Sequence, residues 1–324
     1  MPTALQNPIR TGKERKPGGP MLSAAEQTRL SWARPVRSMD ELPPAYRGFF
    51  EAQLVGETFP YSVLTPTFAG FMRRETEKLV CCLDDHLIVL EKTTGAPKCT
   101  AFLLSDLNYL EVGGVLLKAW IKFQGCANNE QTLTTVTLRY NAVTDWLFAP
   151  FIERIRGAGA DPNPVPRDVE LSQLDDVELP SFKFRNYARH SILPGARVIA
   201  VLAQPEVWRP VIRLGRWSYR RTIVMAHVLI LTDRELIIIR DDPDSQHAYD
   251  DTRYGGVWDY IRLEKIEQIV WRNRDAKVLS LALELPFGDR VESLFAADRR
   301  VEAERFLHQV LEWAPEAALQ RGPL

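Results

Sequence analysis

Two stretches of the sequence share one pattern: residues 79–90, LVCCLDDHLIVL, and residues 227–239, HVLILTDRELIII. Each has an apolar run, a short polar turn that contains aspartate, and a second apolar run. This arrangement is typical of a β-hairpin, in which two apolar strands pair across the turn. We therefore predict that one β-rich unit occurs twice along the chain.

The sequence on either side of the two hairpins also corresponds. Upstream, a glycine turn precedes an apolar strand in each copy, at Gly56 before Val63 and at Gly195 before Val201. Glycine is favoured in such turns because it has no side chain to clash when φ is positive. Downstream, the apolar patterns predict strands over residues 114–123, 132–140, 278–285 and 289–296.

Each copy then ends in an amphipathic helix. The first helix is predicted from about Thr144 to Arg156, with a break at Pro150 because proline lacks a backbone donor. The second is predicted from Asp298, as the N-cap, to Trp313, with an apolar stripe at helical spacing. The expected fold class is thus β-rich α+β.

The domain boundaries follow from composition. The 324 residues, of which 45% are hydrophobic and 26% charged, have the composition of a globular protein and the length of about two domains. Residues 1–37 contain seven basic and two acidic residues, and residues 157–180 contain four prolines and six acidic residues. We expect a flexible basic arm at 1–37, a domain at 38–156, an acidic linker at 157–180, a domain at 181–315 and a tail at 316–324.

The charge balance and the cysteines limit the class of protein. A net charge of -1 excludes a uniformly basic coat for nucleic acid. The sequence has no apolar run long enough for a membrane span and no signal-peptide pattern at its start. The four cysteines form no C-x-x-C pair, so neither a disulfide framework nor a zinc site is indicated. We expect a cytoplasmic protein with no transmembrane segment.

The repeated unit resembles the pleckstrin-homology (PH)-like superfamily, and in detail its bacterial PH-like and GRAM-like domains. The resemblance rests on Leu54-Val-Gly56-Glu57, on Leu193-Pro-Gly195-Ala196 and on the hairpin Leu231-Thr232-Asp233-Arg234-Glu235-Leu236. The first copy departs from the pattern, with Asp84 in the place of the threonine. The resemblance implies two bent antiparallel β-barrels, each closed by a C-terminal helix. It also implies a non-catalytic binding role, with lipids, peptides or proteins as partners.

One segment combines basic and aromatic residues, residues 208–221, WRPVIRLGRWSYRR. It lies between the first two predicted strands of the second copy, where domains of the resembled family often bind lipid phosphates. Guanidinium groups match phosphate oxygens, and tryptophan suits a membrane interface. The first copy has a weaker counterpart in Arg73 and Arg74. The candidate binding residues are therefore Trp208, Arg209, Arg213, Arg216, Trp217, Arg220, Arg221, Arg73 and Arg74.

These residues favour an adaptor that lies at an anionic membrane surface. The alternative is a protein-interaction scaffold without membrane affinity, which binds a partner peptide at a sheet edge or in a helix groove, with the arm or the linker as that peptide in cis. Nucleic acid is a less favoured partner. We expect no enzyme activity, no cofactor and no metal, because no catalytic motif is present and the aspartates of residues 241–251 lack the spacing of a calcium loop.

Overall fold

The computed structural model describes residues 31–54, 58–69, 74–157, 174–175, 177–214, 217–241, 255–314 and 316–321. For residues 68–69, 74, 210–214, 217–220 and 321 it describes the backbone alone. The fold is β-rich α+β, with antiparallel sheets and a few helices. Most of the expected linker, the aspartate-rich segment after Asp241 and Gly56 lie outside the described residues.

The first repeat begins with a five-stranded sheet in the order β1-β2-β5-β6-β7. The hairpin predicted at 79–90 is confirmed as β5 and β6, which turn at Asp84 and Asp85. Helix α2 covers this sheet with the buried rings of Tyr46 and Phe50. The bounds are β1 Arg34–Val36, a 3-10 turn Met39–Glu41, α2 Pro44–Gln53, β2 Ser62–Leu64, β3 Phe68–Ala69, β4 Arg74–Glu75, β5 Lys78–Leu83, β6 His86–Glu91 and β7 Lys98–Leu103.

Three further strands and a helix complete the first repeat. The helix follows a 3-10 turn and buries Phe151 and Ile155 in the same core as the strands. The bounds are a 3-10 turn Leu104–Asp106, β8 Leu107–Val115, β9 Lys118–Cys126, β10 Leu133–Asn141, a 3-10 turn η3 Ala142–Leu147 and α3 Ala149–Gly157.

The second repeat follows the same order of elements. Its hairpin β14–β15 is the one predicted at 227–239, and the Thr232 hydroxyl fixes the turn by accepting hydrogen bonds from the backbone nitrogens of Arg234 and Glu235 at 3.2 and 3.0 Å. The bounds are α5 Phe182–Ser191, β11 Val198–Gln204, β12 Val207–Leu214, β13 Trp217–Val224, β14 His227–Thr232, β15 Glu235–Arg240, β16 Gly256–Arg262, a 3-10 turn Leu263–Lys265, β17 Gln268–Asn273, β18 Val278–Leu285, a 3-10 turn Pro286–Gly288, β19 Asp289–Ala296, a 3-10 turn Ala297–Arg299, α6 Arg300–Trp313 and β20 Ala318–Arg321.

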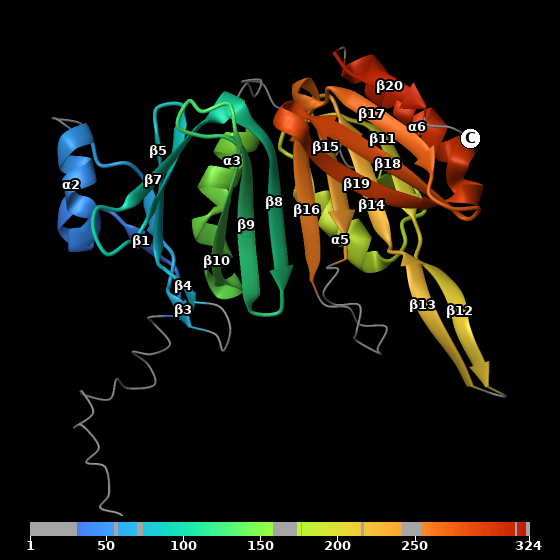
Figure 1. The fold of residues 1–324 in the computed structure, drawn as a ribbon, viewed down its shortest axis with the longest axis horizontal. Coiled ribbons are helices and arrows are strands. Elements are labelled where there is room, and N and C mark those ends of the chain that lie inside the picture. The colour runs from blue at the N-terminus through green and yellow to red at the C-terminus, as the bar shows by residue number, and fades with distance from the viewer. Residues whose placement is uncertain are drawn as a thin grey trace, which may run out of the picture.

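One sheet runs through both repeats. Strand β8 of the first repeat pairs with β16 of the second, which gives a seven-stranded sheet in the order β10-β9-β8-β16-β15-β14-β11. The two repeats consequently lie side by side along the long axis of the molecule (Figure 1). None of the sheets among the described strands closes, so the prediction of two barrels is wrong. Instead, β8 of the first repeat pairs with β16 of the second.

Side-chain hydrogen bonds reinforce the junction between the repeats. The Gln124 amide on β9 donates to Asp289 Oδ1 on β19 at 2.6 Å, and the Asn108 amide donates to Asp289 Oδ2 at 3.2 Å. The Arg262 guanidinium on β16 donates to the carbonyl oxygens of Leu104 and Ser105 at 3.0 and 2.9 Å. Backbone pairing and side-chain contacts thus hold the two repeats in one arrangement.

Several predicted boundaries differ from those of the structure. Strand β1 lies inside the expected arm and pairs with β2, and β20 lies inside the expected tail and pairs in parallel with β17. The strand expected at 114–123 is divided by a turn at Leu116 and Leu117. The helix expected from Asp298 begins at Arg300, and its N-cap is Arg299. Pro150 lies in the first turn of α3, where its missing donor is tolerated.

Candidate functional site

The segment at 208–221 forms most of a separate two-stranded hairpin, β12–β13. Its strands pair with each other and with no other described strand. The hairpin leaves the body between β11 and β14 and projects from one side of the second repeat (Figure 1). Its register shifts near Pro210, which has no backbone N–H to donate to the ladder. The prediction that this segment lies between the first two long strands of the second copy is confirmed.

Two arginines are paired across the base of this hairpin. Arg209 on β12 lies directly opposite Arg221 on β13, and both side chains are exposed. Like charges directly opposite on paired strands are destabilising. We expect this pairing to cost some stability in the free protein, which a bound anion would offset.

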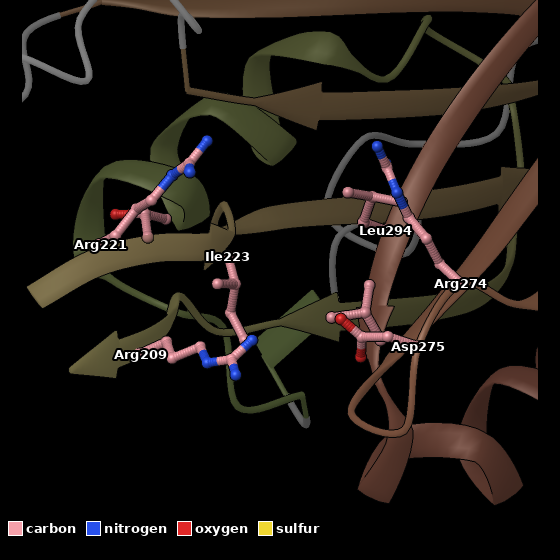
Figure 2. Close-up of a pocket in the computed structure, with 8 residues that line it drawn as sticks. Arg209, Arg221, Ile223, Arg274, Asp275 and Leu294 are labelled. Carbon is pink, nitrogen blue, oxygen red and sulfur yellow. The ribbon is translucent and has the colours of Figure 1, made fainter. Parts of the chain in front are cut away.

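A third arginine lies across a groove from this pair. The groove has a volume of about 510 Å³ and lies between the hairpin and the sheet of β17, β18 and β19. Figure 2 shows Arg209, Arg221 and Ile223 on the hairpin side, with Arg274, Asp275 and Leu294 on the other. The lining residues, here named the arginine groove, are Arg209, Arg221, Thr222, Ile223, Arg274, Asp275, Val278 and Leu294.

The charges of the arginine groove are not neutralised within the part of the chain that the structure describes. No described carboxylate forms an ion pair with Arg209, Arg221 or Arg274. Asp275, the acidic residue of the groove, accepts a hydrogen bond from the backbone nitrogen of Lys277 at 2.7 Å. Its carboxylate thus holds the β17–β18 turn that carries Arg274. The groove combines three guanidinium groups with an apolar floor of Ile223, Val278 and Leu294.

The structure places some of the predicted site residues together and leaves others undescribed. Arg209 and Arg221 meet at the groove, and Trp208, beside them on β12, is 47% exposed. Arg213, Trp217 and Arg220 lie on the two strands, where only the backbone is described, and so does Arg74 at the start of β4. Arg73 and Arg216 lie outside the described residues.

Arg274 and the apolar floor were not among the predicted site residues. Arg274 follows β17 in a turn, where a basic side chain is a common surface feature. Its role depends on the packing of β13 beside β19, two strands far apart in the sequence. The one signal in the sequence is the presence of three charged residues, Arg272, Arg274 and Asp275, within four positions.

No protein-family description and no curated protein sequence matches the chain. Among the described residues, no three or more histidine, cysteine or acidic side chains are placed to bind a metal ion together. No helix in the described part of the chain has the length and apolar character needed to cross a bilayer.

Proposed function

We propose that the chain is a non-catalytic adaptor of two PH-like domains that binds an anionic membrane surface through the arginine groove. The observation that carries the proposal is the pairing of Arg209 with Arg221 opposite Arg274, with no described carboxylate to neutralise them. Three guanidinium groups around one groove suit phosphate oxygens, which they bind in bidentate fashion. The protein would then be peripheral to the membrane and face the cytoplasm.

The order of elements supports the resemblance to PH-like domains. Each repeat has four strands of one sheet, then three strands, then a C-terminal helix. In the first repeat these are β2, β5, β6 and β7, followed by β8 to β10 and α3. In the second they are β11, β14, β15 and β16, followed by β17 to β19 and α6. Each repeat also inserts a hairpin after its first long strand, β3–β4 and β12–β13.

The exposure of the hairpin supports a surface role. If the segment were a strut between the two domains, its tryptophans would be buried at their junction. Trp208 is instead 47% exposed, and the hairpin projects away from the β8–β16 junction (Figure 1). An exposed tryptophan beside arginines suits a membrane interface, where one part of the ring is apolar and the indole N–H is hydrated.

The alternative, a scaffold that adds a partner peptide to a sheet edge, has less support. The edge of β17 in the sheet beside α6 is covered by the chain's own β20, and the edge of β2 is covered by β1. The edges of β2 and β17 are therefore already paired, whereas β7, β10, β11 and β19 are edge strands of the described sheets. Strand β1, from the expected arm, is the segment that pairs with β2.

Vesicle co-sedimentation tests the proposal with a charge-matched control. The test variant is Arg209→Glu/Arg221→Glu, and the control is Arg34→Glu/Arg305→Glu, which changes two exposed arginines on β1 and α6, away from the groove. We expect the wild type and the control to bind vesicles that contain phosphatidylserine, less tightly at high salt. The test variant should bind them about thirtyfold less tightly or worse. Equal binding by the test variant and the control would overturn the proposal.

A further inference from the structure

The turn between β8 and β9 exposes two large apolar side chains. Leu116 is 73% exposed and Leu117 is 62% exposed. Leu116 has a φ of 53°, in the left-handed region that favours glycine or asparagine. A leucine there strains the backbone and leaves its side chain in water. Strain of this kind at an exposed turn points to a functional role for the side chain.

A second exposed segment adjoins this turn. The backbone nitrogen of Ala142 donates to the carbonyl oxygen of Leu117 at 3.0 Å, which holds the start of η3 against the turn. In η3, Val143 is 51% exposed and Trp146 is 68% exposed. These four side chains, Leu116, Leu117, Val143 and Trp146, are here named the apolar tip. Such a group of exposed apolar residues is typical of an interaction surface.

The apolar tip lies at the same end of the seven-stranded sheet as the base of the β12–β13 hairpin. A continuous row of paired residues joins the two. Gln204, the last residue of β11, pairs with His227, His227 with Arg240, Arg240 with Val257, and Val257 with Gly113 near the end of β8. Both features therefore leave the sheet at one end, and both point to the same side in Figure 1.

The spacing of the strands sets the distance between the two features. Neighbouring strands lie about 4.8 Å apart, so the four steps from β11 to β8 span about 19 Å along the sheet. The pairing of β8 with β16 fixes this separation, because it joins the repeats within one sheet. One flat surface can contact both features together.

We propose that the apolar tip enters the interfacial layer of the same anionic bilayer whose phosphates the arginine groove binds, an inference that rests on the proposed function. A bilayer offers both chemistries side by side, anionic headgroups for the arginines and acyl chains for the leucines. Trp146 suits the headgroup level. Lys118, exposed beside the turn, adds a positive charge at the rim. Asp145 is the acidic residue of η3, between Val143 and Trp146 of the apolar tip. Its carboxylate accepts a hydrogen bond from the Tyr140 hydroxyl at 2.7 Å.

The strain at Leu116 makes a clean test possible. Asparagine adopts a positive φ more readily than leucine, so Leu116→Asn/Leu117→Gln removes the apolar side chains without harm to the turn. The matched control is Val301→Gln, which removes an apolar side chain that is 66% exposed on α6. A melt of each variant in buffer checks that the fold is retained.

The experiment measures binding to vesicles of phosphatidylcholine and phosphatidylserine, with some of the phosphatidylcholine brominated on its acyl chains. We expect Leu116→Asn/Leu117→Gln to bind about tenfold less tightly and Val301→Gln to bind like the wild type. Bromine should quench part of the tryptophan emission of the wild type, and Trp146→Phe should show less quenching, since Trp208 at the hairpin remains.

The outcomes separate this inference from the proposed function. If Leu116→Asn/Leu117→Gln binds like the wild type and Trp146 is not quenched, the proposed role of the apolar tip is wrong. The proposed role of the arginine groove is unaffected by that result. If Arg209→Glu/Arg221→Glu binds like the wild type but the leucine variant is weakened, the arginine groove is overturned and the tip stands. If the wild type binds no vesicle, both are overturned.

Discussion

The guanidinium of Arg156, in the last turn of α3, donates to both carboxylate oxygens of Glu235, at 3.2 Å from Nε and 2.6 Å from Nη2. Glu235 is the first residue of β15. This ion pair therefore connects α3, the C-terminal helix of the first repeat, with the β14–β15 hairpin turn of the second repeat. The guanidinium also lies 3.7 Å from the ring centre of Tyr260. Both charged side chains are nearly inaccessible to water, 7% and 3% exposed.

Removal of one partner should strongly destabilise the protein. We expect Glu235→Ala to cost about 3–5 kcal/mol in the free energy of unfolding, because it leaves the Arg156 charge buried without a carboxylate to neutralise it. Urea denaturation measures the loss. Asp175→Ala, which breaks the largely exposed pair with Arg189, should cost less than about 1 kcal/mol. A loss for Glu235→Ala as small as that of Asp175→Ala would show that the pair does not hold the repeats.

The packing of β8 makes a second prediction, with a control at the next residue. A Cβ added at Gly113 would lie 2.1 Å from the ring of Trp120, whereas a Cβ at Gly114 would meet nothing within 4 Å. The Trp120 indole donates to Glu111 Oε1 at 2.8 Å, so the ring is held in place. We expect Gly113→Ala to lower the stability by about 1–3 kcal/mol and Gly114→Ala to leave it nearly unchanged. Thermal melts compare the two, and equal melting temperatures would contradict the prediction.

The sequence predicts local pairings well and pairings between the repeats poorly. Both hairpins were visible because each is two apolar runs joined by a short polar turn. The β8–β16 pairing was not, because nothing in either strand specifies which distant strand completes the sheet. The turn at Leu116 was missed for a related reason: its two leucines extend the apolar run, so a strand is predicted straight through it. The same two leucines, Leu116 and Leu117, belong to the apolar tip.

The candidate site shows the same limit. Arg209 and Arg221 were selected for their chemistry, but their position opposite each other depends on the register of β12 with β13. Arg274 joins them only because β13 packs beside β19. Composition thus identifies the hairpin, and tertiary packing identifies the groove.

The Arg209–Arg221 pair predicts a stability that responds to anions. Without an anion, Arg221→Gln should raise the free energy of unfolding by about 0.2–1 kcal/mol, because it removes the repulsion across the strands. Inorganic pyrophosphate should raise the melting temperature of the wild type, since it binds the native state only. Pyrophosphate should raise the melting temperature of Arg221→Gln by less. It should raise the melting temperature of Arg305→Gln as much as that of the wild type. An equal response of all three proteins would place the anion elsewhere.

His227 predicts a pH dependence of stability. Burial lowers its pKa to about 4, and its Nδ1 lies 3.0 Å from the carbonyl oxygen of Met225. Between this pKa and the ordinary value of 6.5, the unfolded chain binds the proton and the native state does not. Stability should therefore fall as the pH falls through this window, by about 3 kcal/mol in total from this residue.

Urea denaturation of His227→Gln between pH 7 and about pH 4 tests this expectation. The variant should lose less stability over that range than the wild type, whatever its stability at pH 7. His308→Gln, at an exposed position on α6, should keep the wild-type slope. A slope for His227→Gln that equals the slope of the wild type would exclude His227 as its source.

We expect the acidic segment between β15 and β16 to weaken binding to anionic vesicles, whereas the arginines strengthen it. Most of its residues lie outside the described part of the chain, but it joins Arg240, the last residue of β15, to Gly256, the first of β16, and both of these lie at the end of the sheet near the apolar tip. We expect its negative charges, tethered at these two points, to oppose binding to an anionic membrane. We expect neutralisation of Asp242, Asp244, Asp250 and Asp251 to asparagine to tighten binding to phosphatidylserine vesicles severalfold, and more at low salt than at high salt. The control neutralises four exposed acidic residues elsewhere, Glu51, Asp298, Glu312 and Glu316. If the affinity of both variants for the vesicles rises equally, net charge alone determines binding. The position of the acidic segment would then not matter.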